Sequence, residues 1–103
     1  MATLQEQQAK LQVKLEELLG SKNVYYQAPG RIDYPAIKYE IDDIEATHAN
    51  NSVYRTSRRY KVTVIDGLPD NPVIDKILEL PMCSYDRHYV SDNLNHDVLT
   101  LYW

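Results

Sequence analysis

The sequence has 103 residues, 44% hydrophobic and 25% charged, a composition typical of one soluble globular domain. Fifteen acidic and eleven basic residues give a net charge of −4, which argues against a dedicated DNA-binding or membrane-binding protein. The single cysteine, Cys83, excludes an internal disulfide and a cysteine-rich zinc site, and no apolar run is long enough to span a bilayer. The first ten residues lack the apolar core of a signal peptide, so we expect a protein that stays in the cytosol.

Residues 1–20 are predicted to form an N-terminal helix. Thr3 and Glu6 have the spacing of a capping box, and Gly20 suits a left-handed C-cap. The apolar stripe consists of Leu4, Leu11, Leu15 and Leu18. Because this stripe is narrow, we expect the helix to lie on a sheet, and a short strand is predicted to follow it at residues 23–27.

A long β-hairpin is predicted over residues 36–65, because two runs alternate between apolar and polar residues. A two-residue turn at Asn50-Asn51 would join them. The apolar face would then pair Ile37 with Val64, Tyr39 with Val62, and Ile41 with Tyr60. The wet face would pair Glu40 with Lys61 and Asp42 with Arg59. A bulge near Asp42-Asp43 would turn Ile44 inward and complete the apolar face.

The length of this hairpin has a consequence of its own. Each strand of the hairpin, 37–48 and 53–64, would be about 40 Å long at about 3.3 Å per residue. A domain of this size has a radius of gyration of only about 13 Å. Residues 45–55 should therefore extend beyond the core, and since isolated two-stranded ribbons are marginally stable, we expect them to rest on another subunit.

The remaining residues complete a small α+β domain. A second helix is predicted at 71–80, with Asn71 as its cap and Pro72 at its first turn, followed by a C-terminal hairpin over 85–103 with a turn at 91–93. The order is α-β-β-β-α-β-β within one domain, 1–103. The predicted architecture is a small antiparallel sheet packed by the two helices.

The basic cluster in the hairpin allows two interpretations. Four bases, together with two tyrosines, could grip phosphates; they are Arg55, Arg58, Arg59 and Lys61, with Tyr54 and Tyr60. The acids across the hairpin are Glu40, Asp42, Asp43 and Glu45. Because the predicted register places acid opposite base, we favour mutual neutralisation over phosphate binding.

The segment Asp86-Arg87-His88 places an acid, a cation and a general base side by side. Neighbouring strand residues face opposite sides, so we expect only Asp86 and His88 to share a face, which favours a solvated strand or an interface over a catalytic site. The histidines His48, His88 and His96 have no metal-site spacing, and the glycines form no phosphate-binding loop. We therefore predict no catalytic, cofactor-binding or metal-binding residues.

The order of elements and several segments resemble the tail terminator, or tail completion, proteins of long-tailed bacteriophages. The resemblance covers nearly the whole chain. It rests on the segments LEELLGSKNVYY, YPAIKYEI, RRYKVTVID, PVIDKILEL and DNLNHDVLTLYW. It implies a structural virion protein, assembled in the host cytoplasm, that forms a ring, typically of six subunits, at the head-proximal end of the tail tube. Such a ring stops tube polymerisation and provides the docking surface for the head.

The resemblance implies as partners further copies of the chain, the tail tube protein and a head-completion or connector protein, with DNA passing through unbound and no membrane. It implies no catalytic residues and no cofactor. From the residues we expect the subunit or tube interface to include Tyr54, Arg55, Arg58, Arg59, Asp86, Arg87 and His88. Two alternatives stay open: another neck or head–tail adaptor or small regulatory binding module, and a toxin-type ribonuclease that uses Arg59, Lys61, Arg87 and His88.

Overall fold

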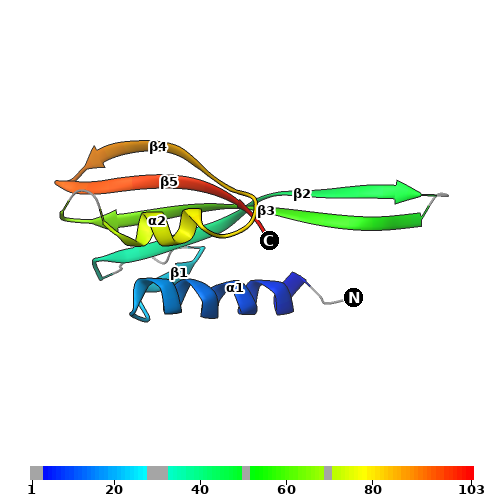
Figure 1. Ribbon diagram of the computed structural model, residues 1–103, viewed down its shortest axis with the longest axis horizontal. Coiled ribbons are helices and arrows are strands. Elements are labelled where there is room, and N and C mark those ends of the chain that lie inside the picture. The colour runs from blue at the N-terminus through cyan, green and yellow to red at the C-terminus, as the bar shows by residue number, and fades with distance from the viewer. Residues whose placement is uncertain (1–3, 28–32, 50–51, 69–70) are drawn as a thin grey trace.

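The computed structural model describes residues 4–27, 33–49, 52–68 and 71–103, and for residues 4, 45–49 and 52–57 it describes the backbone alone. Within these ranges it is an α+β domain of two helices and a five-stranded sheet (Figure 1). The elements are α1 (Leu4–Leu19), β1 (Val24–Tyr26), β2 (Ala36–Ala49), β3 (Ser52–Asp66), α2 (Val73–Leu78), β4 (Cys83–Ser91) and β5 (Leu94–Tyr102).

The sheet is mixed, which corrects the expectation of a purely antiparallel one. Its strand order is β1-β2-β3-β5-β4, and β1 runs parallel to β2 while all other pairs are antiparallel. Backbone hydrogen bonds from Ile37 N to Asn23 O (2.9 Å) and from Gln27 N to Tyr39 O (3.0 Å) flank the parallel pair. Residue alternation in a three-residue strand is the same in either direction, so the sequence carries no signal for this orientation.

The core lies between the sheet and the two helices. Its buried members come from α1 (Leu11, Leu15), from β2 and β3 (Ile37, Tyr39, Tyr60, Val62, Val64), from α2 (Val73, Ile77), and from β1 and β5 (Val24, Leu99, Leu101). The alternating residues predicted for one face of the hairpin are therefore the ones that the helices cover. The opposite face of the sheet carries no helix among the described residues.

Tyr39 fastens α1 to the sheet. Its hydroxyl donates to Gln12 Oε1 (2.5 Å) and accepts from Gln8 Nε2 (2.6 Å). Gln12 Nε2 also donates to the carbonyl of Val24 (2.8 Å). Burial raises the pKa of Tyr39 to about 12, so the phenol stays neutral and can act as donor and acceptor at once.

The predicted pairing of β2 with β3 is confirmed in the core. Ile37 lies opposite Val64, Tyr39 opposite Val62, Ile41 opposite Tyr60, and Glu40 opposite Lys61. The predicted bulge is also present, since the register shifts between Ile41 and Asp43. Two details were wrong: the backbone of Asp43 rather than Asp42 lies opposite Arg59 in the register, and Ile44 remains 47% exposed. Ile44 lies opposite Arg58, beyond the last residue pair of β3 and β5, so no inward position exists for its side chain.

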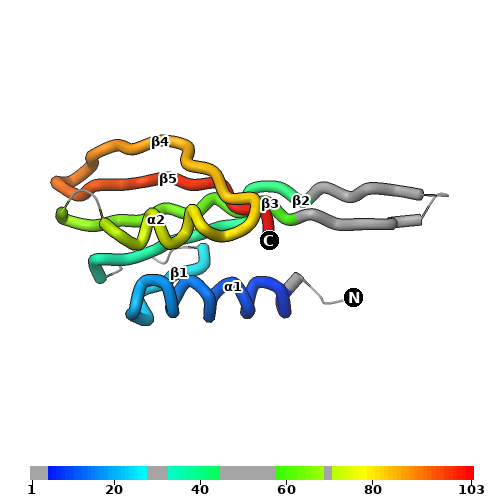
Figure 2. Tube along the Cα trace, in the orientation of Figure 1, coloured from blue at the N-terminus to red at the C-terminus, as the bar shows by residue number. Residues whose placement is uncertain are grey.

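The hairpin continues beyond the rest of the sheet (Figure 1), and Figure 2 traces along the backbone how the two helices lie against the described sheet. The last pair of β3 with β5 is Arg59–Tyr102, and the last pair of β1 with β2 is Tyr26–Tyr39. We call residues 43–58 the arm; beyond the hydrogen bond from Trp103 N to Arg58 O (3.0 Å), its described residues pair with other strands only across the hairpin. The chain measures 51 Å along its long axis and 24 by 23 Å across it. The turn predicted at Asn50-Asn51 lies outside the described residues, as does Thr3 of the predicted capping box.

The second helix and the last hairpin follow the predicted order with different bounds. Helix α2 is shorter than the predicted 71–80; Asn71 Oδ1 accepts from Val73 N (2.9 Å) just ahead of it. The turn between β4 and β5 consists of Asp92-Asn93 alone, both at positive φ (52° and 62°), as a tight two-residue hairpin turn requires. Gly20 has the predicted left-handed conformation, with φ of 76°.

The buried leucine stripe of α1 predicts a specific loss of stability. We expect Leu15→Ala to lower the free energy of unfolding by about 2–5 kcal/mol, because Leu15 is fully buried and its truncation leaves a cavity. Val13→Ala is the matched control: Val13 is on the same helix and 55% exposed, so its loss should change stability by less than about 0.5 kcal/mol. Urea denaturation measures both; equal effects would show that α1 does not pack as described.

Candidate interaction surfaces

The base of the arm carries a cluster of charges on the face away from the helices. Arg59 Nε lies 2.9 Å from Asp42 Oδ2, and Arg59 Nη2 lies 3.9 Å from Asp43 Oδ2. Hydrogen bonds to Tyr102 and to Asp42 raise the pKa of Arg59 above its ordinary value. The bulge brings both carboxylates to one guanidinium, so Arg59 is neutralised as predicted, although by two acids rather than one.

Arg58 is in a different situation, because its cross-strand partner is Ile44 and not an acid. The Nε atom of Arg58 and the hydroxyl of Tyr60 are both buried, and neither has a hydrogen-bond partner among the side chains and backbone groups that the structure describes. Buried polar atoms without a partner are costly and are normally satisfied. The carbonyl of Arg58 accepts from Trp103 N (3.0 Å), and Trp103 Nε1 donates to Gln7 O (3.0 Å), so this position is tied to the C-terminus and to α1. The predicted interface side chains Tyr54 and Arg55 lie outside the described side chains.

Strand β4 is the outer strand of the sheet, and its residues from Ser84 to Ser91 are all exposed. Asp86, Arg87 and His88 lie on it, about two strands away from the base of the arm. The expectation that Asp86 and His88 share a face assumed regular alternation, but the β4 register shifts between Tyr85 and Arg87, with Asp86 as the extra residue. Beyond this bulge Arg87 lies opposite Val98, and His88 opposite Asp97.

Arg87 belongs to an aromatic stack that the sequence analysis missed. Its guanidinium lies 5.5 Å from the ring centroid of Tyr89, and the ring of Tyr89 stacks on His96 with centroids 4.6 Å apart and planes at 11°. Tyr89 and His96 are cross-strand partners, so the pairing of β4 with β5 creates the stack. Arg87 and His88 point to opposite faces, and so the three adjacent polar residues do not converge on one point.

A polar pocket on the helix face of the sheet was also missed. It lies between α2 and the β4–β5 pair and is lined by Asn71, Ile74, Asp75, Tyr85 and Asp97. Asp97 is only 8% exposed, and its Oδ1 accepts from the Tyr85 hydroxyl (2.7 Å). This hydrogen bond raises the pKa of Tyr85 to about 12. The signal was present in the sequence, since the alternation of Asp97 with Leu99 and Leu101 places a carboxylate on the apolar face.

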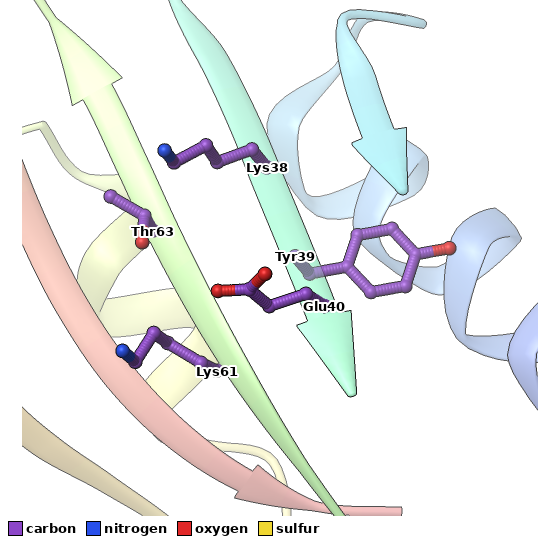
Figure 3. A pocket seen from close by; sticks show the side chains of 5 residues that line it. All are labelled: Lys38, Tyr39, Glu40, Lys61 and Thr63. Atoms are coloured by element: carbon purple, nitrogen blue, oxygen red, sulfur yellow. The ribbon is translucent and has the colours of Figure 1, made fainter. Parts of the chain in front are cut away.

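A second pocket lies on the face without helices, and Figure 3 shows the side chains that line it. Lys38, Glu40, Lys61 and Thr63 project from β2 and β3 on this face, whereas Tyr39 points the other way, towards α1. Two ammonium groups and one carboxylate can attract an anion weakly.

The remaining candidate groups are the metal-ligating side chains and the single cysteine, Cys83. In the part of the chain that the structure describes, no three His, Cys, Asp or Glu side chains are grouped in a way that could hold a metal ion. Burial raises the pKa of the Cys83 thiol, which packs against the core, so the reactive thiolate is disfavoured. Neither described helix is long and apolar enough to cross a membrane.

The comparisons with known proteins give no assignment. The sequence matches no protein-family model, and no curated protein is significantly similar to it.

The contact between Tyr85 and Asp97 predicts a pH effect. The Tyr85–Asp97 hydrogen bond needs the neutral phenol, and the pKa of this phenol is raised in the folded state. The contribution of the hydrogen bond to folding stability is therefore complete below pH 10 and is lost as the pH rises through about 12. Asp97→Asn should lower the pKa of Tyr85 towards 10, measured by NMR titration of ¹³Cζ-labelled tyrosine. Tyr39 is the internal control, since its raised pKa results from burial and should not move; an unchanged Tyr85 would contradict the contact.

Proposed function

We propose that the chain is a tail terminator of a long-tailed phage: a ring at the head-proximal end of the tail tube that stops tube polymerisation and docks the head. The observation that supports this most is the arm, which extends past the last β5 partner of β3 and past the last β1 partner of β2. An isolated two-stranded ribbon is only marginally stable in water. In a ring, the neighbouring subunit that the arm contacts would stabilise it.

The charge and surface chemistry are compatible with this role. Arg58 lies opposite the exposed Ile44, and its buried Nε has no partner within the described part of the chain, a combination that fits a protein contact better than free solvent. The proposed partners are further copies of the chain, the tail tube protein and a head-completion protein. In this proposal DNA passes through the ring without being bound, since a chain with net charge −4 repels it.

The alternatives receive different support. Another neck adaptor or a small regulatory module would use the same arm, and only its partner would differ. A ribonuclease would need Arg59, Lys61, Arg87 and His88 around one phosphate. Arg59 is paired with two acids, and Arg87 and His88 lie on opposite faces of β4, so no observation favours that reading.

The arm proposal predicts that charge reversal at its base abolishes assembly. We expect Arg58→Glu combined with Arg59→Glu to remove rings seen by native mass spectrometry and negative-stain imaging, with tail tubes present and absent. The double variant removes the buried Arg58 Nε proposed to meet the neighbouring subunit, and glutamate at position 59 repels Asp42 and Asp43, whose pairing with Arg59 orients the arm. Circular dichroism checks that the variant is folded.

The matched control reverses two exposed lysines far from the arm in the sequence, Lys10→Glu on α1 with Lys22→Glu in the loop that follows it. This variant should assemble normally. Rings that persist in the arm variant would rule out the arm as the contact. A wild-type chain that neither forms rings nor caps tail tubes would rule out the terminator function.

A further inference from the structure

Strand β4 has a free hydrogen-bonding edge. The Asp92-Asn93 turn makes Ser91 and Leu94 a hydrogen-bonded pair, and at the other end Tyr102 N donates to Met82 O (3.2 Å). Hydrogen-bonded and non-bonded pairs alternate between these two points. The backbone N–H and C=O groups of four residues therefore point outward, those of Cys83, Tyr85, His88 and Val90.

This edge has little protection of the kind that isolates edge strands. It is nine residues long, contains neither lysine nor proline, and no described element covers it. The apolar side chains along it are exposed, Tyr85 by 45% and Val90 by 63%. The bulge at Asp86 interrupts it once, which leaves Arg87–Ser91 as a continuous template for another strand.

The arm carries the complementary feature, a strand with a free edge. The carbonyl of Arg58 accepts from Trp103 N, so Arg58 is bonded on the β5 side of β3. Two residues farther out, the backbone N–H and C=O groups of Thr56 point to the same side of β3, where the described chain offers them no partner. The arm leaves the sheet at the end opposite the β4–β5 turn, so it cannot reach β4 of its own chain (Figure 1).

Charge identifies the strand of the arm that suits this edge. The part of the arm that belongs to β3, residues 52–58, contains two bases, Arg55 and Arg58, and no acid, in a chain whose net charge is −4. A strand added to β4 would run beside Tyr85 and the pocket that holds the buried Asp97 and the exposed Asp75. One oxygen of Asp97 is bonded to Tyr85, and an arginine from the added strand would supply the opposite charge.

We infer that the edge of β4 accepts the β3 strand of the arm of a second copy of this chain, so that each subunit extends the sheet of its neighbour. The inference rests on the proposed ring, and it specifies which two surfaces meet. The contact is head to tail: each subunit gives its arm to one neighbour and its β4 edge to the other. Such a contact closes into a ring when its rotation allows.

Proline substitution tests each side, because it removes an outward N–H without removing a hydrogen bond of the chain's own sheet. His88→Pro disables the edge, and His88→Ala is its control, with the N–H retained. Thr56→Pro disables the arm strand, and Thr56→Ala is its control. We expect each proline variant to weaken self-association at least about tenfold in sedimentation and native mass spectrometry, while the alanine variants behave as the wild type.

Mixing the two proline variants gives the decisive result. The intact arm of the His88→Pro chain should bind the intact edge of the Thr56→Pro chain, producing a 1:1 heterodimer that cannot grow. If His88→Pro does not fold, Val90→Pro with Val90→Ala replaces it, since Val90 also points outward. Assembly of His88→Pro at wild-type strength, the absence of a heterodimer, or a wild-type chain that stays monomeric at millimolar concentration would each overturn the inference.

The outcomes separate this inference from the proposed function. Rings or tube capping that survive both proline substitutions leave the terminator function standing and overturn the edge contact. Edge-paired oligomers that never cap a tail tube support the edge contact and overturn the function.

Discussion

The pairing of β2 with β3 is the interaction on which the rest of the structure depends. It places Tyr39, Tyr60, Val62 and Val64 on one face, and the two helices cover that face. Tyr39 then holds α1 through Gln8 and Gln12, and β3 serves as the template for β5, which in turn pairs with β4. A register shift of one residue would move this whole apolar set to the uncovered face, so the core strongly specifies the register.

The arm is a continuation of this same ladder beyond the reach of the core. Up to Arg59 the hairpin has β5 beside it, and farther out its strands have only each other. The bulge at Asp42 marks the transition, and there Arg59 meets two carboxylates. This ion pair is exposed and screened by solvent, so we regard it as a contact that sets the direction of the arm rather than as a source of stability.

The two outer strands of the sheet differ in length and in exposure to solvent. β1 is only three residues long and lies beside α1, whereas β4 is nine residues long and exposed from Ser84 to Ser91. Short edges resist further pairing, and long uncovered ones invite it. Growth of the sheet is therefore possible chiefly on one side, and a subunit with one donor strand and one acceptor edge is suited to a directional assembly.

The sequence by itself determined the elements that depend on local pattern. Alternation over residues 37–42 and 59–64, opposite charges at Glu40 and Lys61, and glycine at position 20 each specify a local conformation, and the hairpin register and the helix end followed from them. The phage-tail resemblance and the interface residues Tyr54 and Arg55 remain predictions. The tertiary structure decided what depends on residues distant in the chain: the parallel direction of β1, the exposure of Ile44, the Tyr89–His96 stack and the Tyr85–Asp97 pocket. Each of these is set by which elements become neighbours, and a pattern along one strand contains no information about that.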